Sequence, residues 1–93
     1  MPERPQDADA IQERIRQVLL NEWDPIGVSH IPEAHDEYDS YVGGVYRLLA
    51  SDASEYELIE HLYDLETLSM GLRGNRKGLK DVAAKLAALK VSL

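Results

Sequence analysis

Apolar residues recur every three or four positions along most of the chain, which is the spacing of one face of an α-helix. Phenylalanine is absent, and runs of β-branched residues are missing. This pattern predicts a compact all-α domain of four helices, with a long proline-containing loop between the first helix and the second. We expect residues 1–8 to be a flexible N-terminus and residues 9–93 to be a single helical domain.

The first helix is predicted to begin with Asp9 as its N-cap, because Gln12 follows three residues later as in a capping box. Its apolar face consists of Ile11, Ile15, Val18, Leu19 and Trp23. Pro25 ends this helix, because proline disfavours the helical conformation at the preceding residue. We expect the loop over residues 24–35 to fold back on the domain and to bury Ile26, Val28 and Ile31.

The segment Trp23–Gly27 reads Trp-Asp-Pro-Ile-Gly and predicts a structural turn. Trp23 closes the apolar face of the first helix. Asp24 is placed to accept backbone hydrogen bonds from the turn that Pro25 begins, and Gly27 permits a positive φ. We interpret this segment as a structural hinge and not as a ligand site.

The second helix is predicted from about Asp36 to Ser51, with an apolar stripe of Tyr38, Tyr41, Val42, Val45, Leu48 and Leu49. Gly43 and Gly44 are unusual in its interior, since each glycine costs roughly 0.5–1 kcal/mol relative to alanine. Close approach of a neighbouring helix or of the proline loop at Gly43 is the favoured explanation, and a ligand contact is the alternative.

The third helix opens with a capping box of Ser54 and Glu57 and runs to about Met70, with Gly71 as its C-cap. Its core stripe is Leu58, Leu62, Leu65 and Ser69. A basic turn over residues 72–78 leads to the last helix, which is predicted over about residues 77–91. That helix places Leu79, Val82, Ala83, Leu86 and Leu89 inward, and Lys77, Lys80 and Lys85 outward.

The outer face of the third helix mixes tyrosines with acidic residues. Tyrosine is enriched at binding hot spots, and flanking carboxylates steer a basic partner. We therefore predict a partner-binding surface that consists of Tyr56, Glu57, Glu60, Tyr63 and Asp64. The alternative is that Tyr63 and Met70 widen the core contact of a central helix that is packed on two sides.

Glu66 lies between the two faces of the third helix, near Ile59 and Leu62. A carboxylate in such a position needs a partner, because burial of an unpaired charge is costly. We expect Arg47 or a basic residue of the 73–77 turn to pair with it.

Charge is distributed unevenly along the chain, whose formal net charge is −7. Residues 24–70 hold eleven acidic residues and one basic residue, whereas residues 71–93 hold six basic residues and one acidic residue. A strongly negative block repels nucleic acid and speeds encounters with basic partners. The alternative is that the acids only keep a small domain soluble.

The length and composition of the chain limit its class. Ninety-three residues suffice for one core, and the absence of cysteine excludes disulfides and thiolate metal sites. We find neither the apolar run of a signal peptide nor the roughly 18 consecutive apolar residues of a spanning helix. These features predict a cytoplasmic protein without membrane contact.

Candidate chemistry is sparse. A metal site would need His30, His35 or His61 with nearby carboxylates such as Asp36, Glu60 or Asp64, and no zinc-binding spacing is matched. No nucleophile motif or phosphate-binding glycine loop is present, and solvated carboxylates do little acid–base work. We predict no catalytic residue, no metal and no cofactor.

Three segments carry a resemblance to a known family: Trp23–Gly27, the cluster over residues 37–42 (Glu-Tyr-Asp-Ser-Tyr-Val), and residues 66–71. Over about residues 11–72 the chain resembles the small bacterial helical proteins of the YugE-like family, whose function is unknown. Some relatives of that family resemble immunity proteins of contact-dependent growth inhibition systems. The resemblance implies a helical fold in the bacterial cytoplasm and no established active site, and it does not extend to the basic last helix.

Taken together, these features predict a non-enzymatic acidic protein-interaction domain. An immunity protein that neutralises a basic toxin is one specific form of this prediction. The expected partner is a basic protein, with no nucleic acid and no membrane. The alternative is a cytoplasmic helical regulator or housekeeping protein that acts as a homodimer through an apolar flank of the second or last helix. Both a monomer and a homodimer fit the sequence.

Overall fold

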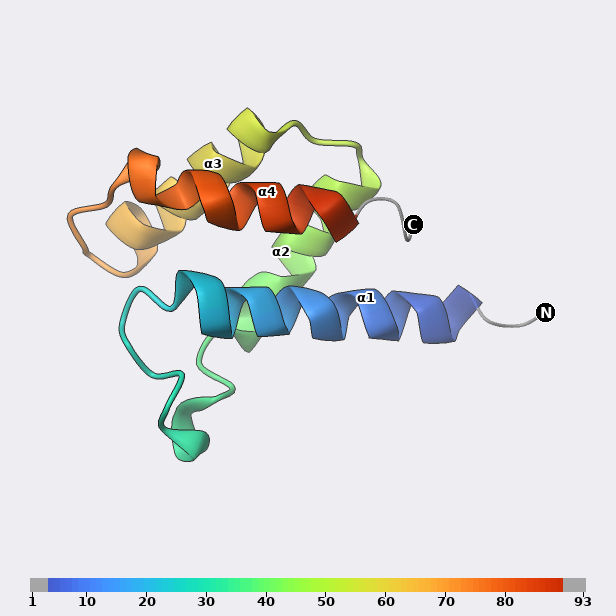
Figure 1. Cartoon of the computed structure of the whole chain (residues 1–93), viewed down its shortest axis with the longest axis horizontal. Helices are drawn as coiled ribbons and strands as arrows, with labels where there is room; N and C mark the ends of the chain where they lie inside the picture. The colour runs from blue at the N-terminus through green and yellow to red at the C-terminus, as the bar shows by residue number, and fades with distance from the viewer. Residues whose placement is uncertain (1–3, 90–93) are drawn as a thin grey trace.

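A computed structural model describes residues 4–89, which form four α-helices and no strand. The helices are α1 (Arg4–Val18), α2 (Asp39–Ala50), α3 (Glu55–Asp64) and α4 (Lys80–Ala88). Helices α1 and α4 contact each other and run in opposite directions, and α2 crosses behind them (Figure 1). The prediction of an all-α four-helix domain is confirmed. No helix among residues 4–89 has both the length and the apolar character needed to cross a membrane.

Two helices continue into π-helical turns. Residues Leu19–Trp23 extend α1, and residues Leu65–Ser69 extend α3. Each turn closes with a hydrogen bond to the carbonyl five residues back, from Asp24 N to Leu19 O (2.9 Å) and from Met70 N to Leu65 O (2.9 Å). A π-helical turn contains more residues per turn than an α-helix, so it changes which side chains face the core at these two helix ends.

The core draws side chains from all four helices. Its fully buried members include Ile15, Leu19, Val45, Leu58, Leu62, Ala83 and Leu86. These residues lie on the predicted apolar stripes, so the stripes are largely confirmed. Ser69 is exposed, and its predicted core position is wrong. Relative to a continuous α-helix, the π-helical turn that begins at Leu65 rotates the following side chains about the helix axis. Glu66 consequently occupies a buried position.

The start of α1 differs from the prediction. The helix begins at Arg4, so Asp9 lies inside it and is not its N-cap. Residues 4–8, which were predicted to belong to a flexible N-terminus, are helical, and residues 1–3 lie outside the described part of the chain. Pro5 falls in the first turn, where proline is tolerated because the amide N–H there has no helical partner.

The predicted turn after α1 is confirmed in its geometry. Trp23 is buried at the end of the π-helical turn, and Asp24 adopts the left-handed conformation with φ 36°. The Asp24 carboxylate accepts hydrogen bonds from Val28 N (2.7 Å) and Ser29 N (3.1 Å). Gly27 has φ +69°, a conformation that glycine adopts without strain. Pro25 begins the loop and α1 does not continue past it.

The loop that follows is held by hydrogen bonds rather than by burial of its apolar side chains. Ile26 is 45% exposed and Ile31 is 40% exposed, so the prediction that both are buried is wrong, and Val28 alone of the three packs against the core. Tyr38 Oη accepts from Ile26 N (3.2 Å), and His35 Nε2 donates to Ser29 O (2.8 Å). These bonds hold a loop that projects from the helices (Figure 1).

Helix α3 approaches the glycine pair of α2 at Gly44 and not at the predicted Gly43. Gly43 is exposed, and the nearest atom to a Cβ placed there would be Arg47 Nη1 at 4.0 Å. The predicted close approach at Gly43 is therefore wrong. A Cβ on Gly44 would lie 3.4 Å from His61 Nε2, so Gly44 is where the third helix comes close. Helix α2 also begins at Asp39 and not near Asp36, because turns occupy residues 35–38.

The predicted start of α3 is confirmed, whereas its helical run ends at Ser69 with Met70, and not the predicted Gly71, as the C-cap. Ser54 Oγ accepts from Glu57 N (3.1 Å), and Glu57 Oε1 accepts from Ser54 N (2.8 Å), which together form a complete capping box. Gly71 follows the π-helical turn with φ +70°. A 3₁₀ turn (Arg76–Leu79) then leads into α4, whose inward residues are buried as predicted apart from half-buried Leu89. The predicted end of α4 near Val91 lies outside the described residues.

A buried hydrogen bond joins the two π-helical turns. Trp23 Nε1 donates to Glu66 Oε2 (2.8 Å), and the indole ring packs on Tyr38 and Tyr41 with centroid distances of 5.4 and 6.2 Å. The partner of Glu66 is thus a neutral indole N–H, and the expected partners, Arg47 or a base of the 73–77 turn, are wrong. The π-helical turn of α3 directs Glu66 inward, toward the end of α1.

Replacing Trp23 tests this connection. Trp23→Ala should lower the free energy of unfolding by about 3–5 kcal/mol, the usual cost of truncating a buried aromatic residue. Trp23→Phe keeps an aromatic ring but leaves the Glu66 carboxylate without its donor, so we expect a loss of about 1–3 kcal/mol in urea denaturation. Adding Glu66→Met should restore part of that loss. Equal stability of Trp23→Phe and wild type would contradict a stabilising bond.

Candidate partner-binding surface

The five residues predicted to bind a partner all lie on α3. We call them the α3 acidic surface: Tyr56, Glu57, Glu60, Tyr63 and Asp64. Tyr56 is 69% exposed, and Glu57 and Asp64 are exposed, whereas Glu60 and Tyr63 are half-buried. Leu58 and Leu62 of the same helix are fully buried. The five residues thus differ in how far they are exposed to solvent.

The two tyrosines differ in their surroundings. Tyr63 packs against the edge of the core, as does Met70, which agrees with the alternative that both widen the core contact. Tyr56 remains on the open surface. The two rings therefore do not form one uniformly exposed aromatic face, and Tyr56 is the tyrosine that a partner can reach most freely.

Arg76 of the basic turn occupies the middle of the α3 acidic surface. Its Nε lies 2.6 Å from Glu60 Oε2, and its Nη2 donates to Glu60 Oε1 (3.0 Å). The guanidinium carbon lies 3.8 Å from the centroid of the Tyr63 ring, a cation–π contact. The hydrogen bonds from Arg76 lower the pKa of Glu60, and the same bonds raise the pKa of Arg76. Both groups therefore stay charged at neutral pH.

The backbone of the basic turn lies directly on α3. Gly74 has φ +82°, and a Cβ placed on it would lie 2.7 Å from both Tyr63 Cε1 and Thr67 Cγ2. A larger residue would force either the turn or the Tyr63 and Thr67 side chains to move. Thr67 Oγ1 donates to Tyr63 O (2.9 Å), which fixes the threonine under the turn. The turn thus brings Arg76 to Glu60 by close contact of its own backbone with the helix.

Glu57 has a structural role in addition to its place on this surface. Its carboxylate closes the capping box with Ser54. A substitution at Glu57 would therefore change both the start of α3 and the surface charge. Asp64, the last residue of α3, is exposed. Burial lowers the pKa of His61, and the negative charge of Asp64 acts to raise it.

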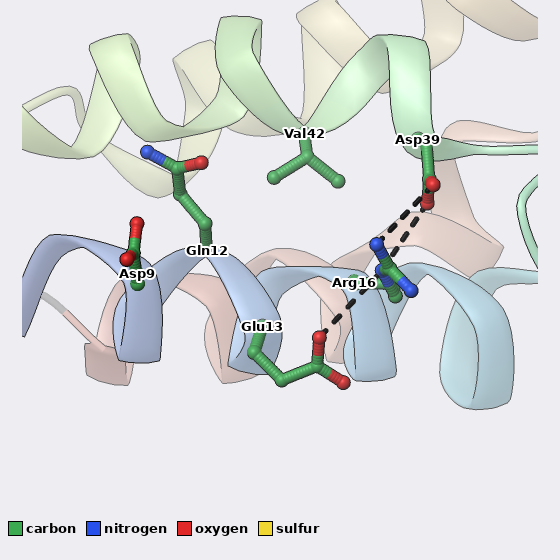
Figure 2. A pocket seen from close by; sticks show the side chains of 6 residues that line it. All are labelled: Asp9, Gln12, Glu13, Arg16, Asp39 and Val42. Carbon is green, nitrogen blue, oxygen red and sulfur yellow. Dashed lines mark hydrogen bonds and ion pairs between the residues drawn. The ribbon is translucent and has the colours of Figure 1, made fainter. Parts of the chain in front are cut away.

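A second candidate site is an open polar pocket of about 230 Å³ between α1 and α2, which is lined by Asp9, Gln12, Glu13, Arg16, Asp39 and Val42. Arg16 Nη2 donates to Asp39 Oδ2 (3.2 Å), and Arg16 Nε lies 3.2 Å from Asp39 Oδ1 (Figure 2). Glu13 lies 3.7 Å from the same nitrogen. The arginine is thus neutralised by its neighbours, and the pair ties α1 to the first residue of α2.

The histidines considered as metal ligands have different surroundings in the structure. His35 is bonded to the loop backbone, His30 is exposed, and His61 faces Gly44. Burial lowers the pKa of His61, with the charge of Asp64 acting in the opposite direction. Among residues 4–89, no three acidic or histidine side chains gather in an arrangement that could hold a metal ion.

Comparisons of the chain with protein-family models, with curated proteins and with solved structures found no match. The resemblance to the YugE-like family therefore remains a prediction.

The tyrosines can be separated by stability measurements. Tyr56→Ala should change the free energy of unfolding by less than about 0.5 kcal/mol, because the side chain is exposed. Tyr63→Ala removes a half-buried ring that supports Gly74 and Arg76, and should cost about 1–2 kcal/mol, below the range for a fully buried ring. Thermal melts of both variants measure this difference. A large loss from Tyr56→Ala would show that this ring is packed and not available to a partner.

The Asp24 turn should contribute a pH-dependent stability. Burial raises the pKa of Asp24, but hydrogen bonds from Val28, Tyr38 and Ser29 together outweigh it and hold the pKa below its ordinary value of 3.8. Burial also raises the pKa of Tyr38 to about 12, so its hydroxyl keeps the proton that it donates to Asp24 (2.9 Å).

Because the pKa of Asp24 is lower in the folded state, the unfolded chain binds more protons in acid, and the stabilisation is lost as the pH falls through and below 3.8. Asp24→Asn should therefore be less stable than wild type above about pH 5, and the difference should shrink toward pH 3. Urea denaturation at several pH values measures this. A difference that grows in acid would contradict the assigned sign, and Asp36→Asn, at an exposed loop carboxylate, serves as the matched control.

Proposed function

We propose that this chain is a non-enzymatic, cytoplasmic protein-interaction domain that binds a basic protein through the α3 acidic surface. The observation that supports the proposal is the placement of Arg76 on Glu60 and Tyr63. This surface binds a guanidinium group by two charge-assisted hydrogen bonds and one ring face, which is the chemistry that a basic partner would use.

The residues around Arg76 leave room for further contacts. Tyr56 precedes Glu60 by one helical turn and is 69% exposed, and Asp64 follows Glu60 by one turn and is exposed. An exposed tyrosine beside acids is typical of a hot spot, because its rigid ring gives contact area at low entropic cost. The acidic block over residues 24–70 would attract a basic partner from a distance.

Neutralisation of a basic toxin is one form of this function. A toxin that acts on nucleic acid needs a positively charged cleft, and an immunity protein can cover such a cleft with acids and tyrosines. The α3 acidic surface carries both residue types on one helix. This support comes from surface chemistry and not from a shared family.

The alternative of a homodimer through α2 or α4 has less support. The exposed residues of α2 and α4 within the described chain are small, polar or charged: Ser40, Gly43, Arg47, Ala50, Lys80, Asp81, Ala84, Lys85 and Ala88. These exposed residues include no large apolar side chain, whereas homodimer interfaces are more apolar than the rest of a protein surface.

The proposal can be tested by capture of partners from the native host at moderate salt, followed by mass identification. We expect wild type to retain a basic protein, and Tyr56→Ala to weaken its binding by at least about tenfold, as a hot-spot residue does. Glu33→Gln, at an exposed acid of the proline loop, is the control and should bind as wild type does.

The association rate with the purified partner should fall as ionic strength rises from low to physiological, because screening shortens the range of the field. Asp64→Asn should lower the rate at low salt more than Glu33→Gln does, since Asp64 adjoins the contact. A partner that binds Tyr56→Ala and wild type equally, or an association rate that does not depend on salt, would argue against the α3 acidic surface.

A further inference from the structure

We propose that Arg76 is an internal ligand of the α3 acidic surface, and that the partner displaces it with an arginine of its own. This inference rests on the proposed function, because it concerns the same surface. It names the partner chemistry more narrowly: a segment that presents an arginine, and not simply a positively charged patch.

The choice of arginine follows from the contact geometry. Glu60 is held by two nitrogens of Arg76 at 2.6 and 3.0 Å, while the carbon of the same guanidinium lies 3.8 Å from the centroid of the Tyr63 ring. A planar guanidinium can make both contacts at once. A lysine ammonium is a point charge without the planar fork, so it cannot reproduce this pair of contacts.

The Arg76 side chain can leave without disturbing the core. It is 55% exposed, and the Glu60 side chain is 28% exposed. An ion pair that water reaches contributes little to stability, because water solvates the separated charges well. Displacement of the guanidinium by a partner therefore exchanges one solvated ion pair for another and leaves the buried face of α3 intact.

The backbone of the basic turn has supports that do not involve the Arg76 side chain. Gly74 rests on Tyr63 and Thr67. Asn75 Oδ1 accepts from Lys77 N (3.1 Å) and Gly78 N (3.4 Å), and so caps the 3₁₀ turn in which Arg76 lies. The side chain can swing away from Glu60 while these contacts hold the turn in place. The partner then meets a preformed site.

Occupancy by Arg76 has a consequence for affinity. A ligand that binds only the open surface has an apparent dissociation constant equal to its intrinsic one divided by the fraction of molecules in which the surface is open. If Arg76 covers Glu60 about nine-tenths of the time, its removal should tighten binding of an external arginine by about tenfold. Arg76 would therefore set a threshold that only partners with additional contacts, such as contacts to Tyr56, can pass.

The experiment uses a short glycine–serine peptide with a single arginine, titrated into the full chain while the resonances of Tyr56 and Tyr63 are followed by NMR. We expect Arg76→Gln to bind this peptide several-fold to about tenfold more tightly than wild type. Lys77→Gln removes the same charge at the next residue, which is exposed, and should bind as wild type does. The same peptide with lysine should gain much less from Arg76→Gln.

The inference would be overturned by equal affinity of wild type and Arg76→Gln, by an equal gain for Lys77→Gln, or by an equal gain for the lysine peptide. Glu60→Gln added to Arg76→Gln should remove the gain, and its persistence would also count against the site. Circular dichroism checks that each variant is folded. Should Arg76→Gln unfold, Arg76→Lys replaces it, and a lack of any gain for Arg76→Lys would then overturn the inference.

Failure of this inference can be told apart from failure of the proposed function. A captured host protein that depends on Tyr56 but binds Arg76→Gln no more tightly than wild type would support the proposed function and overturn the displacement of Arg76. A gain in peptide affinity for Arg76→Gln, without any basic protein captured by wild type, would support the arginine site and count against the proposed function.

Discussion

The hydrogen bond from the Trp23 indole to the Glu66 carboxylate connects the ends of α1 and α3 through two π-helical turns. A buried carboxylate that loses its donor costs more than the bond itself contributes, so this contact resists rearrangement. On one side, the Trp23 ring packs on Tyr38, whose hydroxyl donates to Asp24 and orders the proline loop. On the other side, Glu66 precedes the turn that carries Arg76 back to α3. The loop and the basic turn thus both follow segments that this bond joins.

Features governed by local chemistry could be predicted from the sequence. The capping box of Ser54 and Glu57 and the turn at Asp24 follow from side chains that bond to backbone within a few residues. Several errors fall where one helix meets another, although the N-cap predicted at Asp9 is a local prediction that is also wrong. The π-helical turn that buries Glu66 and exposes Ser69 has no signature in an apolar periodicity, and the close approach at Gly44 rather than Gly43 depends on where His61 lies. Ile26 and Ile31 stay exposed because hydrogen bonds already order their loop.

The candidate site shows the same division. Helical periodicity placed its five residues on one helix, because their spacing is a local property. The pairing of Arg76 with Glu60 spans sixteen positions and a turn whose path depends on Gly74, so sequence spacing did not predict it. The sequence predicts that a base of the 73–77 turn pairs with an acid of the third helix, but it names Glu66 as that acid instead of Glu60. The π-helical turn directs Glu66 to the core and leaves Glu60 as the acid that an exposed arginine can reach.

The uneven charge of the chain is partly balanced inside the fold. Basic residues of the C-terminal part lie against acids of earlier segments, Arg76 beside Glu60 and Lys85 at 4.0 Å from Glu22. A group tethered by a short segment acts at an effective concentration in the millimolar range. On the proposed function, an external arginine would have to displace the tethered Arg76, and a partner would do so by adding contacts that Arg76 does not make, for which exposed Tyr56 is the neighbouring group. Specificity at such a surface would therefore come from the tyrosine, while the acids supply attraction that many basic proteins share.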